Sequence, residues 1–182
     1  MICKLNDYSE SQIEDESLAK FLNDLPQDVR AKYATYLDSQ EQLKNALSLY
    51  FNSPNQYQSI TPLIVFNELS YEIVTLLLNN NELPDEVGEE GSILAFIRAA
   101  GYTDQFMCSD CYGQLSCSSC AVEVLQGTLE NPFPRDEEFD MLDIDESKPP
   151  TEKTRLGCQA KVGTTPLLLK IRAPEKIIIS KV

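Results

Sequence analysis

The sequence contains no histidine and no tryptophan among its 182 residues. Without an imidazole, the chain lacks the usual general base, the usual nitrogen ligand for metals and every catalytic triad that depends on histidine. Basic residues are also scarce, because 15 lysines and arginines stand against 29 acids and the formal net charge is -14. Such a charge disfavours nucleic acid and anionic membrane surfaces as partners and favours a basic protein surface.

Long apolar runs are absent as well. No run approaches the roughly 18 residues of a membrane span, and the first ten residues, MICKLNDYSE, lack the basic and apolar regions of a secretory signal. A transit peptide is rich in arginine and poor in acids, whereas four acids crowd residues 10–16. We therefore expect no membrane insertion and a cytoplasmic location, with the mitochondrial matrix as the alternative if the chain is processed.

Residues 1–57 have the pattern of a helical extension. Apolar residues at helical spacing predict a first helix from Ser9 to the break at Pro26, and a second helix after it. Ser39 and Gln42 resemble a capping box that restarts a helix, so we expect an extension of two or three helices. This extension is interpreted either as a packing layer or as a docking element for a stable protein partner.

Residues 58–182 change to a mixed pattern of strands and helices. Two aliphatic runs around a turn predict a hairpin, and capped or acidic segments predict helices. The expected elements are strands at 61–66, 71–78, 121–125 and 166–173, helices at 92–101 and 136–144, and an acidic loop at 79–90. This order predicts an α+β fold in which sheet and helices share one core.

The cysteines carry the strongest chemical signal. Four of the six fall within thirteen residues, and without an export signal this crowding indicates metal ligation rather than disulfides. Cys111, Cys117 and Cys120 are spaced C-x5-C-x2-C, and Cys158 follows after 37 residues. Three ligands on one loop and a fourth far along the chain suit a 2Fe-2S cluster, and the glycine and serines of the loop let amide groups approach the sulfurs.

Zinc is the alternative metal. The loop contains two CxxC pairs, the first beginning at Cys108, and thiolates bind zinc tetrahedrally. The five-residue spacer is short for a zinc ribbon, and a zinc site leaves Cys158 unexplained. We therefore favour the cluster and expect Cys108 and Cys3 to be ordinary thiols.

Four features occur in a fixed order along residues 58–182. They are the C-x5-C-x2-C loop, DEEFDMLD at 136–143, RLGCQ at 155–159 and KIRAP at 170–174. With these features the chain resembles ferredoxins of the adrenodoxin type. The resemblance implies a β-grasp-like 2Fe-2S ferredoxin fold after the helical extension, with one cluster held by Cys111, Cys117, Cys120 and Cys158.

The resemblance also implies how partners bind. In proteins similar to adrenodoxin, acids on the helix at 136–143 dock basic patches of a ferredoxin reductase and of an electron acceptor. The partner-binding residues implied here are Asp136, Glu137, Glu138, Asp140 and Asp143. Ala121 and Tyr112 depart from the family pattern, and Arg155 is interpreted either as a surface cation or as a structural salt bridge near Cys158.

The function implied by the resemblance is one-electron transfer rather than catalysis, which is compatible with the absence of histidine. The expected carrier works between a reductase and an acceptor such as a haem-thiolate monooxygenase or the iron–sulfur assembly machinery. The alternative is a ferredoxin-like subunit of a larger, respiratory assembly, anchored by residues 1–57 and holding a mainly structural cluster.

Overall fold

A five-stranded mixed sheet lies at the centre of the protein, whose computed structural model describes residues 16–67, 70–144 and 149–172. The strands are β1 (Ile60–Asn67), β2 (Glu72–Asn79), β3 (Ala121–Gln126), β4 (Thr154–Leu156) and β5 (Leu167–Ile171). Their order is β2-β1-β5-β3-β4, in which β1 and β5 are parallel and the other neighbours are antiparallel. This is the topology of a β-grasp sheet, so the predicted fold class is confirmed.

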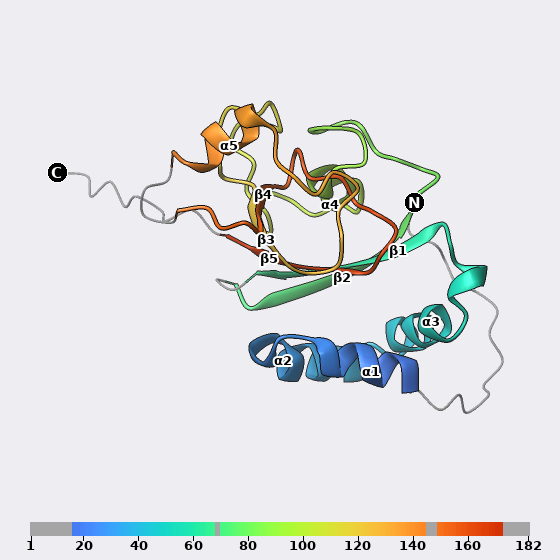
Figure 1. Cartoon of the computed structure of the whole chain (residues 1–182). Coiled ribbons are helices and arrows are strands. Elements are labelled where there is room, and N and C mark those ends of the chain that lie inside the picture. Colours follow the sequence, from blue (N-terminus) through green and yellow to red (C-terminus); the bar gives the residue numbers. More distant parts are fainter. Residues whose placement is uncertain (1–15, 68–69, 145–148, 173–182) are drawn as a thin grey trace.

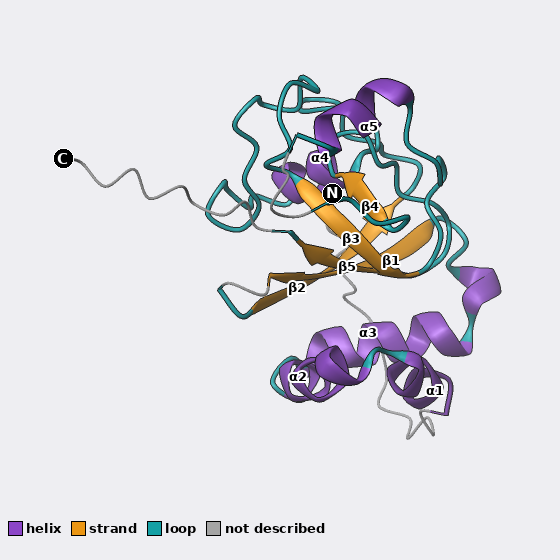
Figure 2. Ribbon diagram, turned by 60° about the vertical axis from the view of Figure 1, so that its left-hand side comes forward, coloured by secondary structure: helices purple, strands orange, loops and turns teal. Residues whose placement is uncertain are grey.

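Helices cover both faces of this sheet. They are α1 (Glu16–Asp24), α2 (Gln27–Asp38), α3 (Glu41–Asn52), α4 (Ile93–Ala99) and α5 (Asp136–Leu142), with a short 3-10 turn at Pro54–Gln56. Figure 1 shows α1–α3 below the sheet and α4 and α5 above it, and Figure 2 shows the same two layers from another side. None of the helices in the described ranges is long and apolar enough to cross a membrane.

The central strands are buried on both faces because alternate side chains enter two different cores. In β1, Leu63 and Val65 pack with α4, whereas Ile64 and Phe66 pack with α1–α3. Leu168 of β5 joins the helical layer, while its neighbours on the strand join the other core. The helical extension therefore packs on the sheet, as the packing-layer interpretation predicts.

Most predicted elements occur within a few residues of their expected bounds, but the capping box is wrong. Ser39 ends α2 instead of beginning α3, because its hydroxyl donates to the Tyr36 carbonyl at 2.6 Å. Gln40 takes the N-cap position of α3 without a side-chain hydrogen bond. Strand β4 was not predicted, and the predicted helix start at Ser9 lies outside the described residues.

Candidate metal centre

The four predicted ligands meet where strand pairing brings two distant segments together. Cys111 and Cys117 lie in the loop between α4 and β3, and Cys120 directly precedes β3. The antiparallel pairing of β3 with β4 places Cys158, in the turn after β4, beside Cys120. The Gly157 N–H donates to the Cys120 carbonyl at 2.9 Å and fixes this approach.

The four thiols lie in two pairs. Cys111 pairs with Cys117, and both are partly buried, whereas Cys120 pairs with Cys158, and both are buried. Burial raises the pKa of Cys111, but hydrogen bonds from the Ser116 backbone and from Cys117 bring it down to about 7. The bond in which Cys120 donates to Cys158 raises the pKa of Cys120, aided by burial, and lowers the pKa of Cys158.

Backbone N–H groups also point at the sulfurs. The N–H groups of Ser116 and Leu115 face the sulfurs of Cys111 and Cys158, respectively, whereas the Gln114 N–H donates to the Cys111 carbonyl oxygen at 3.2 Å. The N–H of Cys158 itself is directed at the Cys120 sulfur. Amide donors of this kind stabilise thiolate charge, and their arrangement matches the concave anion-binding loops built from successive amides.

The loop reaches this shape through left-handed backbone conformations. Tyr112, Gly113 and Leu115 have φ angles of 53°, 80° and 52°. Such angles are uncommon for residues with a side chain and often mark functional loops. Here they turn the chain so that consecutive amides face the thiols.

The acidic loop after β2 forms one wall of the site. A Cβ atom on Gly113 would lie 2.5 Å from the Gly88 nitrogen, and a Cβ atom on Gly88 would lie 2.7 Å from the Cys158 oxygen. The Glu89 N–H donates to that oxygen at 2.8 Å. Two glycines thus allow three backbone segments to touch. The sequence does not predict this arrangement, because each segment alone has the pattern of an ordinary loop.

The prediction that Glu138 binds a partner is wrong. Glu138 is 1% exposed, and its two carboxylate oxygens accept hydrogen bonds from Arg155 at 2.8 Å each. One of them also accepts the Leu156 N–H at 2.8 Å. The ion pair ties α5 to the strand that precedes Cys158, which confirms the structural interpretation of Arg155.

The other acids of α5 face outward. Asp136, Glu137, Asp140 and Asp143 are exposed. At the start of the helix, Arg135 donates to Gln159 at 2.5 Å, next to Cys158, and to Glu89 at 3.2 Å. The start of α5 is therefore connected to the walls of the cysteine site.

Cys108 lies beside the site but has a different partner. Its thiol donates to Asp110 Oδ1 at 3.1 Å, and burial together with Asp110 raises its pKa. Cys3 lies outside the described residues. Within the described part of the chain, no three His, Cys, Asp or Glu side chains are grouped so that they would hold a single metal ion.

Comparison with known proteins finds a family model that matches the region containing this site. Residues 78–163 match the profile of the 2Fe-2S iron-sulfur cluster binding domain. The cofactor of that domain is the predicted 2Fe-2S cluster, and the four thiols, with amide groups facing their sulfurs, are the donors that such a cluster requires. No curated protein matches the chain.

Several solved structures are similar to the chain. A ferredoxin from Rhodopseudomonas palustris HaA2 is 21% identical with a TM-score of 0.42, covering 63% of this chain and 96% of that one. The ISC-like 2Fe-2S ferredoxin FdxB from Pseudomonas putida is 22% identical with a TM-score of 0.45, covering 63% and 94%. A reduced putidaredoxin variant from Pseudomonas putida is 18% identical with a TM-score of 0.41, covering 61% and 95%.

Proposed function

We propose that this chain, whose residues 78–163 match the model of the 2Fe-2S iron-sulfur cluster binding domain, is a one-electron carrier between a reductase and an acceptor protein. A bound 2Fe-2S cluster supplies one-electron redox chemistry. The observation that carries the proposal is the set of four thiols in two adjacent pairs, with backbone amides directed at them. The ligands in this proposal are Cys111, Cys117, Cys120 and Cys158.

The backbone around these thiols can stabilise one added negative charge without a proton transfer. A cluster held by four thiolates would be negatively charged, and one-electron reduction would add one further negative charge. The amides of Leu115 and Ser116 are fixed by the loop and need no reorganisation to stabilise that charge. Preorganised donors of this kind favour the reduced form, whereas the surrounding acids oppose it.

The partner surface in the proposal is the exposed face of α5. Four exposed acids there, Asp136, Glu137, Asp140 and Asp143, suit a basic patch on a reductase and on an acceptor. The helix is held against the segment before Cys158 by the buried pair of Glu138 and Arg155. A partner bound to α5 would therefore be close to the proposed ligands.

The alternative, a subunit anchored by residues 1–57, draws less support from the structure. Helices α1–α3 place their apolar side chains against the sheet. Among the described residues of these helices, no large hydrophobic side chain is exposed. Their apolar surface is thus engaged within the chain.

The deciding experiment is spectroscopy on protein purified without oxygen. Visible absorption and EPR spectra are recorded before and after dithionite, and iron, acid-labile sulfide and zinc are quantified. A brown protein with about two irons per chain and a one-electron EPR signal on reduction supports the proposal. A colourless protein that contains zinc contradicts it.

A further inference from the structure

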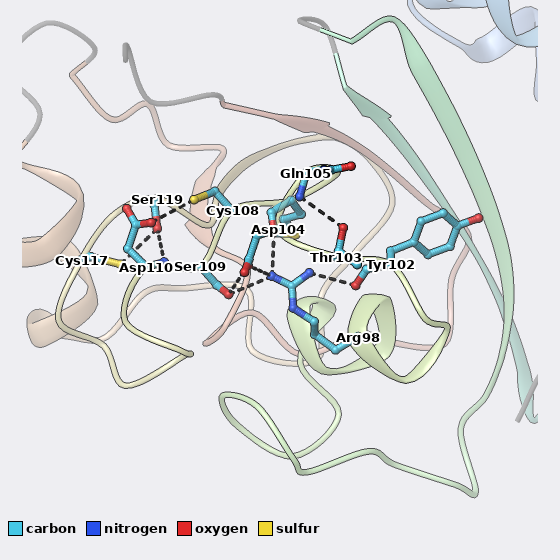
Figure 3. Close-up of polar contacts among 11 residues, drawn as sticks. Arg98, Tyr102, Thr103, Asp104, Gln105, Cys108, Ser109, Asp110, Cys117 and Ser119 are labelled. Atoms are coloured by element: carbon cyan, nitrogen blue, oxygen red, sulfur yellow. Dashed lines mark hydrogen bonds and ion pairs between the residues drawn. The ribbon is translucent and has the colours of Figure 1, made fainter. Parts of the chain in front are cut away.

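Arg98, in the last turn of α4, fixes the segment that leads into the cysteine loop (Figure 3). The side chain is 17% exposed. Its guanidinium donates to four groups of this segment: the Tyr102 oxygen at 3.0 Å, the Met107 oxygen at 2.8 Å, Ser109 Oγ at 2.8 Å and the Asp104 carboxylate. Ser109 is 3% exposed and donates in turn to Asp104 Oδ1 at 3.0 Å.

A chain of hydrogen bonds continues from this segment to a proposed ligand. Asp110 follows Ser109, and its N–H donates to Ser119 Oγ at 2.9 Å. Ser119 is 5% exposed, and its Oγ lies 3.2 Å from Cys117 Sγ. Because the Ser119 oxygen accepts the backbone N–H of Asp110, the Ser119 hydroxyl proton is free to point at a sulfur.

Two sulfurs, those of Cys108 and Cys117, lie within reach of this hydroxyl proton, and their chemistry separates them. Cys108 donates its own proton to Asp110 Oδ1 at 3.1 Å and is therefore a neutral thiol in this arrangement. Cys117, as a proposed iron ligand, is a thiolate. Anionic acceptors form the stronger hydrogen bonds, so the Ser119 hydroxyl donates to Cys117.

We infer that Arg98 is a positioning residue for the redox centre. It holds the entering segment so that Asp110 and Ser119 direct a hydroxyl proton at Cys117. The inference rests on the proposed function, since it takes Cys117 to be a ligand. Hydrogen bonds to ligand sulfurs favour the more negative, reduced state and raise the reduction potential, so Arg98 raises the potential and slows cluster loss.

The test measures reduction potential, the rate of cluster loss to a chelator and the melting temperature of cluster-bound variants. Arg98→Met and Ser119→Ala are both expected to lower the potential, with several-fold faster cluster loss for Arg98→Met. Their double variant adds little to the larger single shift, because both changes act on one donor. Ser48→Ala removes a hydroxyl that donates to the Lys44 oxygen within α3, and it leaves the potential unchanged.

Two further variants separate positioning from charge and from general stability. Arg98→Lys keeps the charge but lacks the planar fork of donors, so its potential is expected to fall as well. Arg30→Met removes an arginine that also donates to backbone oxygens, those of Asn23 and Leu25, but within the helical layer. It is expected to lower only the melting temperature.

Three results would overturn the inference. If Arg98→Met behaves like Arg30→Met, with potential and cluster loss unchanged, Arg98 is purely structural. If Arg98→Lys keeps the wild-type potential while Arg98→Met lowers it, only the charge acts. If the wild-type protein holds no iron, the proposed function fails and this inference fails with it, a result visible before any variant is compared.

Discussion

Among single residues, Glu138 shows how burial changes the role of an acid. It lies in a run of acids, yet its carboxylate is enclosed and accepts three hydrogen bonds from Arg155 and Leu156. Removing one partner of a buried ion pair leaves the other charge uncompensated, which costs about 3–5 kcal/mol. Glu138 therefore stabilises the contact between α5 and β4, the strand that precedes Cys158.

We expect Glu138→Gln to lower the free energy of unfolding by roughly that amount, about 3–5 kcal/mol, in chemical denaturation. The matched control is Asp140→Asn, which neutralises an exposed acid two residues further along α5. A surface change of this kind is expected to stay within about 0.5 kcal/mol. Equal effects of the two variants would contradict the structural role of Glu138.

The two kinds of cysteine in the loop give a second prediction at this scale. Cys117→Ser is expected to abolish the 2Fe-2S spectrum and reduce iron content strongly, because it removes a proposed thiolate ligand. Cys108→Ser is expected to retain the cluster, since Cys108 is hydrogen-bonded to Asp110 instead. Iron analysis and visible absorption of both variants decide the question. A normal cluster in Cys117→Ser would refute the ligand set.

Between elements, the contact of two loops at Gly88 and Gly113 fixes the wall of the site. Gly113→Ala would place a Cβ atom 2.5 Å from the Gly88 nitrogen, so the loops must separate. We expect loss of most of the bound iron and a lower melting temperature. Gly101→Ala is the matched control, because Gly101 has a φ of 87° but no atom near the added Cβ. It costs only about 1–2 kcal/mol of backbone strain and keeps the iron.

The charge of α5 gives another prediction about an element. Reversing Glu137 and Asp140 to Lys is expected to slow reduction by a ferredoxin reductase roughly tenfold at low salt, because charge steering is lost. The difference shrinks at high salt, where exposed charges are screened. Asp28→Lys and Glu41→Lys, on the helical layer, make the same charge change and are expected to have little effect. A salt-independent or equal effect would remove α5 from the docking surface.

The sequence predicts the elements whose signal is local and misses those that depend on distant contacts. The hairpin and α4 follow from short apolar patterns and a serine cap, which the structure confirms through the Ser92 side chain. Strand β4 has only three residues and forms because it pairs with β3. The inward position of Glu138 could have been predicted from the sequence. Glu138 lies four residues before the apolar Leu142, which is buried, and therefore on the same face of the helix.

The site was predictable to the same extent. Cysteine spacing and order identify the proposed ligands and the cofactor, because both can be read directly from the order of residues along the chain. The contact of Gly88 with Gly113 and the reach of Arg98 to Ser109 join segments that only the folded chain brings together. Neither contact leaves a pattern in the sequence.

At the scale of the whole molecule, the sheet is a shared middle layer between the helical extension and the cysteine site. Ile64, Phe66 and Leu168 are at most 2% exposed because α1–α3 cover them. The same strands carry the opposite core, which packs around α4, Cys120 and Cys158. The helical layer therefore stabilises the strands that support the site.

Deleting residues 1–57 is consequently expected to destabilise the remaining chain and promote self-association. Each newly exposed sheet side chain loses roughly 1.5–3 kcal/mol of burial, and such an apolar face favours aggregation. Size-exclusion chromatography and thermal unfolding measure both effects. Leu37→Ala, at a fully buried position of α2, gives a milder version in the full chain and costs about 2–5 kcal/mol, with Gln40→Ala as the exposed control. A truncated chain that stays monomeric, keeps its cluster and melts at the wild-type temperature would instead show that the extension is a separate unit, free to serve as a docking element.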